Sequence, residues 1–248
     1  LCSLTLYFQG EPYLNRHFTE MVRIAAVHNI YTITSTNGHY LDERACRETV
    51  QNGLGELIIS IDGVTQESYA KYREGGLLEK VLEGTRRILD QKKALRRSNP
   101  HVVWQFVVFG HNEHEIPVIR RMAKEMGVDE LRIKTAQIYD HERGNPLLPS
   151  SGEYARYKRR ADGTYAVKNP LYNHCWRMWR SCVITWKGEV VPCCFDKDAT
   201  YKLGKVPEKT FSEVWRSPAY DNFRERVLTA RKSIDICTNC SEGTKIWT

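Results

Sequence analysis

From Ser3 to about Thr135, short apolar or β-branched runs alternate regularly with longer segments of helical period. The runs predict five strands, at Ser3–Phe8, Ile30–Thr34, Glu56–Ile61, Val102–Phe109 and Glu130–Lys134. The segments between them predict four helices, at Arg16–His28, Asp42–Gln51, Leu78–Arg97 and Glu115–Met126. This alternation is typical of parallel strands joined by crossover helices. The sequence therefore predicts an α/β fold built from successive βα steps.

A polar or glycine-containing cluster follows each predicted strand. The clusters are Gln9–Pro12, Ser35–His39, Asp62-Gly63, Gly110–His114 and Thr135–Gln137. Turns also use these residue types. However, the carboxyl ends of parallel strands form a common ligand-binding rim, and five clusters at the same end favour a site over ordinary turns.

The eight cysteines are unevenly distributed. Cys2 and Cys46 stand alone, whereas the others are Cys175, Cys182, Cys193, Cys194, Cys237 and Cys240. The chain shows no secretory signal pattern and no apolar run of the roughly 18 residues that a membrane span needs, so we expect a cytoplasmic protein. A reducing compartment disfavours disulfides. The cysteines of the last third are therefore expected to bind a metal centre.

The spacing of these cysteines predicts a single four-thiolate site. Cys175 and Cys193 flank a hairpin whose turn contains Gly188, and Cys237 and Cys240 form a CxxC knuckle. Four thiolates suit either a cubane iron–sulfur cluster or a structural zinc ion, and spacing alone leaves both open. Cys182 and Cys194 are alternates, although Cys194 should point to the opposite side of the strand from its neighbour.

The pattern Cys175, twelve residues, Gly188, four residues, Cys193 and then Cys237-x-x-Cys240 resembles the auxiliary-cluster domain called SPASM, in its shortened form called twitch. This domain occurs in radical S-adenosylmethionine (SAM) enzymes. The resemblance implies one auxiliary [4Fe-4S] cluster.

Residues 3–138 are similar to the radical SAM superfamily itself. Gly10-Glu11-Pro12 resembles its glycine-glycine-glutamate-proline element, and Ser60–Gly63 with Tyr72-Arg73 resembles its carboxylate- and ribose-binding segment. A glycine allows a ligand to approach the backbone closely, and an arginine can pair with a carboxylate through two hydrogen bonds. The resemblance implies SAM contacts from Gly10, Glu11, Pro12, Asn37, Ser60, Asp62, Arg73, Asn112 and Gln137.

The superfamily's Cys-x3-Cys-x2-Cys motif does not occur in residues 1–248, and only Cys2 precedes Gly10. By this resemblance the sequence begins at the second strand of the barrel. We then expect a second [4Fe-4S] cluster on an upstream segment, and no SAM cleavage by the 248-residue chain alone.

The resulting expectation is a partial (β/α) TIM-like barrel at residues 1–139, a linker and active-site cover at 140–174, and a small α+β cluster domain at 175–248. The function implied by the resemblance is hydrogen abstraction by a 5′-deoxyadenosyl radical. The auxiliary cluster would assist in oxidising or modifying a peptide or small polar substrate. We expect an electron donor such as flavodoxin or ferredoxin and no membrane partner, and no catalytic residue is assigned.

A second hypothesis is a zinc- or cluster-binding protein without radical activity that binds RNA or an acidic partner. Its support is the net charge of +7 and the presence of Trp176, Trp179 and Trp186 near the cysteines. The basic residues between positions 86 and 97 are more simply explained as the solvated face of a helix.

Overall fold

The computed structural model describes residues 1–243, and these residues form two compact units. Unit 1 comprises Leu1–Ile138 and Asn145–Ala155, and unit 2 comprises Tyr139–Gly144 and the chain from Arg156 onward. Residues 140–174 are therefore shared between the two units. In the described part of the chain, no helix is long and apolar enough to span a membrane.

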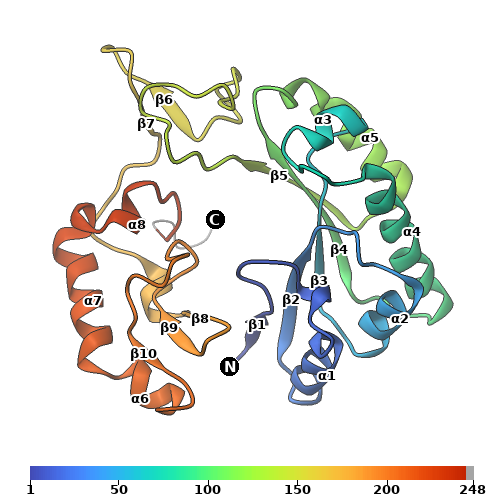
Figure 1. Cartoon of the computed structure of the whole chain (residues 1–248), viewed down its shortest axis with the longest axis horizontal. Coiled ribbons are helices and arrows are strands. Elements are labelled where there is room, and N and C mark those ends of the chain that lie inside the picture. Colours follow the sequence, from blue (N-terminus) through green and yellow to red (C-terminus); the bar gives the residue numbers. More distant parts are fainter. Residues whose placement is uncertain (244–248) are drawn as a thin grey trace. The chain divides into compact units, whose positions relative to one another are not determined.

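Unit 1 contains a parallel sheet in the order β1-β2-β3-β4-β5 (Figure 1). Its strands are β1 (Ser3–Thr5), β2 (Tyr31–Thr36), β3 (Glu56–Ser60), β4 (His101–Val108) and β5 (Glu130–Thr135). Its helices are α1 (Phe18–Val27), α2 (Glu43–Gln51), α3 (Gln66–Ala70), α4 (Leu78–Ala94) and α5 (Ile116–Met126), with short 3-10 turns η1 (Pro12–Leu14) and η2 (Glu113–Glu115). All five strands and four helices predicted from the sequence are confirmed. The short helix α3 and the two 3-10 turns were not predicted.

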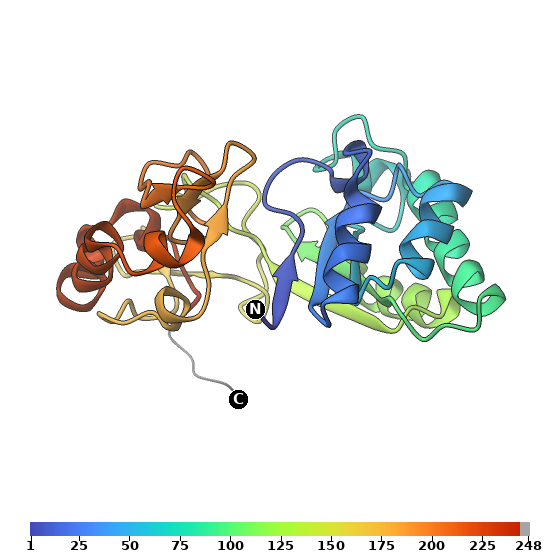
Figure 2. The ribbon, with the colours of Figure 1, turned by 90° about the horizontal axis from the view of Figure 1, so that it is seen from below.

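Helices α1, α2, α4 and α5 cover one face of this sheet (Figure 2). The core between them is a continuous apolar cluster that includes Ile59 and Trp104, both fully buried. The strands of a parallel sheet are typically buried on both faces of the sheet. This explains the near-continuous runs of Val, Ile and Leu in β3 and β4. The observed architecture is the α/β partial barrel expected from the sequence.

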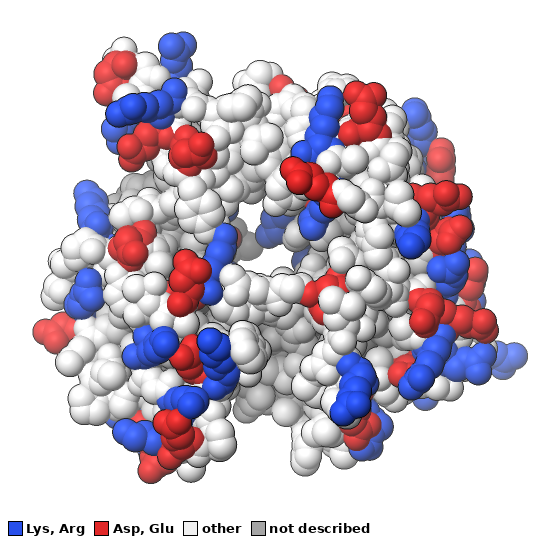
Figure 3. Space-filling model, viewed as in Figure 1, with Lys and Arg blue, Asp and Glu red and all other residues white. Residues whose placement is uncertain are grey.

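The basic stretch on α4 is mostly exposed, as expected for a solvated helix face. Arg87 pairs with Glu83 on the same helix, and acidic and basic side chains are intermixed over this side of the molecule (Figure 3). Lys92 is the exception: it is 9% exposed and its Nζ lies 2.6 Å from Asp129 Oδ2. The expectation that Lys92 belongs to the solvated face was wrong, because its side chain is buried and pairs with Asp129, just before β5.

Unit 2 has shorter elements. Its strands are β6 (Tyr157–Arg159), β7 (Tyr165–Val167), β8 (Val183–Ile184), β9 (Glu189–Val191) and β10 (Gly204–Lys205), paired as β6-β7 and as β10-β9-β8. Its helices are α6 (Phe211–Trp215), α7 (Pro218–Ala230) and α8 (Asp235–Thr238), with 3-10 turns η3 (Trp176–Trp179) and η4 (Arg231–Ser233). The hairpin predicted around Gly188 is confirmed as β8–β9. The β6–β7 pair was missed because three-residue strands are too short to show a period.

Candidate functional site

The polar clusters of unit 1 lie at one edge of the sheet, because its five strands are parallel. Gly10 follows β1, Asn37 follows β2, Asp62 follows β3, Asn112 follows β4 and Gln137 follows β5. Ser60 is the last residue of β3 and is buried. The sheet thus brings the predicted SAM-contacting residues to the same edge, as the sequence pattern suggested.

The Glu11 carboxylate holds the first two of these loops together. It accepts hydrogen bonds from Thr36 Oγ1 at 2.8 Å, from the Asn37 backbone N–H at 2.7 Å and from the Tyr13 backbone N–H at 3.2 Å. Gly10, just before it, has a φ of +80°, and no atom lies within 4 Å of the position a Cβ would take. Glu11 therefore holds the loop after β1 against the end of β2. Gly10 leaves open space beside the backbone, and Pro12 begins η1.

A buried ion pair organises the ends of β3 and β4. Asp62 is fully buried; its Oδ1 accepts from the Val107 backbone N–H at 2.7 Å and its Oδ2 lies 2.6 Å from Arg73 Nε. Burial raises the pKa of Asp62, although Arg73 and the Val107 N–H act in the opposite direction. No hydrogen bond joins the terminal nitrogens of Arg73 to another described residue. Arg73 is thus anchored through Nε, and its terminal nitrogens are available for a carboxylate.

Asn112 connects the ends of β3 and β4 through hydrogen bonds. It is fully buried, its Nδ2 donates to the carbonyls of Asp62 and Val107 at 3.0 Å each, and its Oδ1 accepts from the Phe109 backbone N–H at 2.7 Å. All of these partners belong to the protein. Asn112 therefore positions the loops after β3 and β4 rather than offering a free side chain.

The sequence interpretation missed a group of aromatic rings beside the Asp62–Arg73 pair. The Tyr72 and Phe109 centroids lie 4.3 Å apart, and the His111 ring stacks on Phe109 at 5.6 Å. Burial lowers the pKa of His111, so the neutral ring is favoured. The signal was present in the sequence, since Phe109 and His111 flank the turn after β4 and Tyr72 precedes Arg73.

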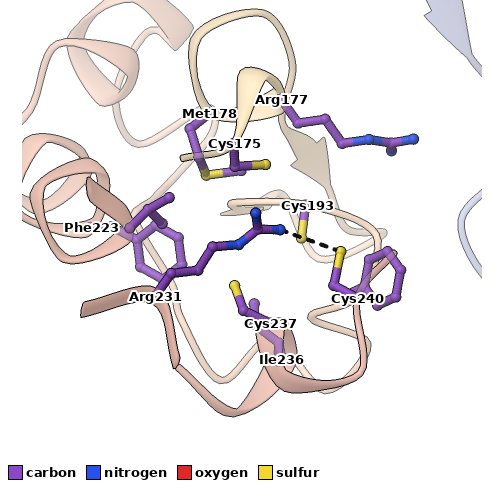
Figure 4. A pocket seen from close by; sticks show the side chains of 11 residues that line it. Cys175, Arg177, Met178, Cys193, Phe223, Arg231, Ile236, Cys237 and Cys240 are labelled. Carbon is purple, nitrogen blue, oxygen red and sulfur yellow. Dashed lines mark hydrogen bonds between the residues drawn. The ribbon is translucent and has the colours of Figure 1, made fainter. Parts of the chain in front are cut away.

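In unit 2, the four predicted ligands line one pocket (Figure 4). Cys175 is the N-cap of η3, Cys193 follows β9, Cys237 lies in α8 and Cys240 lies two residues beyond the end of α8. The alternates do not line this pocket. Cys194 is exposed, with its Sγ 3.6 Å from Arg177 Nη1, and Cys182 packs against the apolar core of unit 2.

The pocket differs from a single-ion site. Within residues 1–243, no three Cys, His, Asp or Glu side chains are arranged to bind one metal ion. A structural zinc ion would need its four sulfurs to converge at about 2.3 Å from one point. In a cubane cluster each cysteine binds its own iron, so the sulfurs stay apart around a larger group. The thiols lining this pocket therefore fit a cluster better than zinc.

Two sets of contacts hold the segments beside the cysteines in place. A Cβ on Gly243, which has a φ of +74°, would clash with Cys175 Sγ, and the Gly243 carbonyl accepts a hydrogen bond from the Trp176 N–H at 3.0 Å. Only glycine permits this approach of the segment after Cys240 to Cys175. The segment after Cys193 is fixed by Asp196, whose carboxylate accepts from the backbone N–H groups of Thr200 and Tyr201 at 2.8 and 2.9 Å.

Burial favours the protonated form of three of the pocket thiols. Burial raises the pKa of Cys193 to about 12 and also raises those of Cys237 and Cys240. Because thiolates are the form that binds metal, loading of the pocket must displace protons.

The chain is similar to a number of curated proteins. The chain is 26% identical to the tungsten-containing aldehyde ferredoxin oxidoreductase cofactor-modifying protein of Pyrococcus furiosus over 95% of its length, and 29% identical to the PqqA peptide cyclase of Gluconobacter oxydans over 89%. It spans 73% and 65% of the lengths of these two proteins. Among solved structures, anSMEcpe with bound AdoMet and the Cp18Cys peptide superposes with a TM-score of 0.62 at 16% identity, over 96% of this chain and 74% of that one.

Two family models match the chain. The model for the radical SAM superfamily matches residues 2–123, and the SPASM model for an iron–sulfur cluster-binding domain matches residues 175–241. These are the regions on which the sequence resemblance rested, and together they imply the expected cofactors, [4Fe-4S] clusters and SAM. The chain therefore belongs to the radical SAM superfamily and carries a SPASM domain.

Proposed function

We propose that unit 1 binds SAM at the carboxyl edge of its sheet and that unit 2 holds an auxiliary [4Fe-4S] cluster on Cys175, Cys193, Cys237 and Cys240. The enzyme would then remove a hydrogen atom from a peptide substrate and form an oxidised or otherwise modified product. The observation that carries this proposal is the convergence of four cysteines, from three separate stretches of a SPASM domain, on one pocket.

The residues of unit 1 have defined roles in this scheme. When bound, SAM and its cluster supply a 5′-deoxyadenosyl radical. The terminal nitrogens of Arg73 would hold the carboxylate or ribose of SAM, the backbone around Gly10 would receive its ammonium group, and Glu11 would keep that loop against β2. Asp62 and Asn112 would position these groups without contacting the substrate.

A peptide substrate is favoured by the relatives. One curated relative is named as a peptide cyclase, and a structural relative was solved with a bound peptide. A small polar substrate is the alternative. An oxidised product requires the substrate radical to lose one electron and one proton, and the cysteine pocket would hold the electron acceptor. An external donor such as flavodoxin or ferredoxin would supply the electron for SAM cleavage.

The competing function is a zinc-binding protein that recognises RNA. The described thiols do not converge on a single-ion geometry, and acidic and basic side chains are intermixed on the face shown in Figure 3. Iron analysis of the anaerobically reconstituted 248-residue chain separates the two functions. We expect about four irons per chain and broad absorption near roughly 400 nm. A colourless protein that holds zinc instead would reject the cluster.

Radical chemistry needs a second assay. A form of the protein that carries Cys-x3-Cys-x2-Cys should release 5′-deoxyadenosine under dithionite, and faster when its peptide substrate is present. The matched control is the same form with the three motif cysteines replaced by alanine, which should release none. No release by the motif-containing form would leave a cluster-binding relative without radical activity.

A further inference from the structure

Arg231 is a buried cation in the cysteine pocket. It is 1% exposed, and its guanidinium points toward the sulfur atoms from the start of η4 (Figure 4). Its Nη2 lies 3.7 Å from Cys240 Sγ, and its Nε is buried without a hydrogen-bond partner. A charge taken out of water is costly unless it is paired.

No carboxylate among the described residues pairs with Arg231. Its guanidinium donates to the carbonyls of Tyr172, His174 and Glu242, which are neutral acceptors. The Glu242 carboxylate is 3.0 Å from Arg177 instead, a half-exposed arginine at the edge of the same pocket. The positive charge of Arg231 therefore faces only neutral groups and the thiols.

The same side chain ties together the segments that carry two of the ligands. The Tyr172 and His174 carbonyls lead into Cys175, and the Glu242 carbonyl follows Cys240. Asn173 fixes Arg231 from the other direction, because its Oδ1 accepts from the Arg231 backbone N–H at 3.1 Å and its Nδ2 donates to the Thr229 carbonyl at 2.8 Å. A group held this firmly next to ligands can orient them and tune what they bind.

We propose that Arg231 is the charge-compensating residue of the auxiliary cluster and raises its reduction potential. A four-thiolate cluster is anionic, and its reduced form carries one more negative charge than its oxidised form. A buried positive charge and an N–H donor to a ligand sulfur both stabilise the reduced form, and net charge and such hydrogen bonds are known determinants of cluster potential. This inference rests on the proposed cluster and would make unit 2 a better electron acceptor.

The test is an anaerobic redox titration of the reconstituted 248-residue chain, followed by electron paramagnetic resonance. Arg231→Met removes the charge at similar size, and Arg231→Lys keeps it. Arg177→Met is the matched control, since solvent screens a half-exposed charge. At the potential that half-reduces the wild-type cluster, we expect Arg231→Met to show at least a tenfold lower ratio of reduced to oxidised cluster. For one electron, tenfold corresponds to about 59 mV. Arg231→Lys and Arg177→Met should stay within threefold of wild type.

An Arg231→Met protein with wild-type iron content and a ratio within threefold of wild type overturns the inference. If Arg231→Met does not retain iron, the Arg231→Lys protein provides the test. An iron-loaded Arg231→Lys protein whose ratio of reduced to oxidised cluster is within threefold of wild type supports the charge role. A tenfold lower ratio rejects it. Failure of both variants to hold iron while folded also rejects it, because geometry rather than charge would then be decisive. If the reconstituted wild-type chain binds no iron, the result contradicts the proposed function, because the auxiliary cluster itself is then absent.

Discussion

Unit 1 buries a continuous apolar cluster between its sheet and helices, and its candidate site lies at the edge of that scaffold. In unit 2 the corresponding cluster has ten buried members among the described residues. Five of them also line the cysteine pocket: Cys175, Met178, Phe223, Val227 and Cys237. The site of unit 2 is therefore part of its core. Loss of a bound ligand should therefore leave unit 1 folded, whereas loss of the metal centre should destabilise unit 2, since small domains depend on such centres.

The largest effect is expected from Cys237→Ser. Removing a ligand should lower iron retention at least about tenfold, since even outer-shell changes typically cost 10–100-fold in metal affinity. Unit 2 should then lose protection in hydrogen exchange, while the strands of unit 1 keep theirs. Cys182→Ser, which lies outside the pocket, is the control and should retain iron. Full iron retention by Cys237→Ser would show that the pocket does not use this cysteine.

The second prediction concerns a substitution in the core of unit 1. Ile59→Ala creates a cavity at a fully buried position in β3 and should cost about 2–5 kcal/mol of unfolding free energy. Denaturant unfolding measures this loss, and iron content should not change. Ile24→Ala on α1, where the side chain is 49% exposed, should cost far less. A parallel loss of iron in Ile59→Ala would mean that the two units are not independent in stability.

The smallest effect concerns binding. Arg73→Ala should weaken SAM binding by about 1.5–3 kcal/mol, the usual contribution of a hydrogen bond to a charged group. Calorimetry on a fraction shown to be folded by circular dichroism is required, because the change also leaves Asp62 without its ion pair. Lys71→Ala, which breaks an exposed pair with Glu67, should bind SAM normally. Equal affinities for the two variants would remove Arg73 from the site.

Most of unit 1 could be predicted from sequence because its signals are local and periodic. The strands and helices are long enough to show their periods, and parallel pairing brings the residues after each strand to one edge. What the sequence could not provide was the use of each side chain. Arg73 pairs with Asp62, and the side-chain amide of Asn112 forms its hydrogen bonds with backbone groups. Both arrangements bring together residues that are separated in the sequence.

In unit 2, the cysteines that line the pocket could be predicted from the sequence better than the strand pairing and the contacts around them. The CxxC spacing and the β8–β9 hairpin are local signals, whereas the β6–β7 pair and the contact of Gly243 with Cys175 are not. Arg231 could not be singled out either, because a basic residue at the end of a helix ordinarily lies in solvent. Its burial depends on carbonyls that come from segments on both sides of it in the sequence.

The approach of Gly243 to Cys175 also has a consequence for biosynthesis. The pocket joins residues that lie 65 positions apart in the sequence, so Cys175 is synthesised before Cys237 and Cys240 exist. At typical rates of 5–20 residues per second, translation from Cys175 to Cys240 takes about 3 to 13 s. During that interval the nascent thiols stand unprotected against oxygen and stray metal ions. Cluster delivery is therefore expected to follow translation of the knuckle, and slower synthesis should increase damage at Cys175 first.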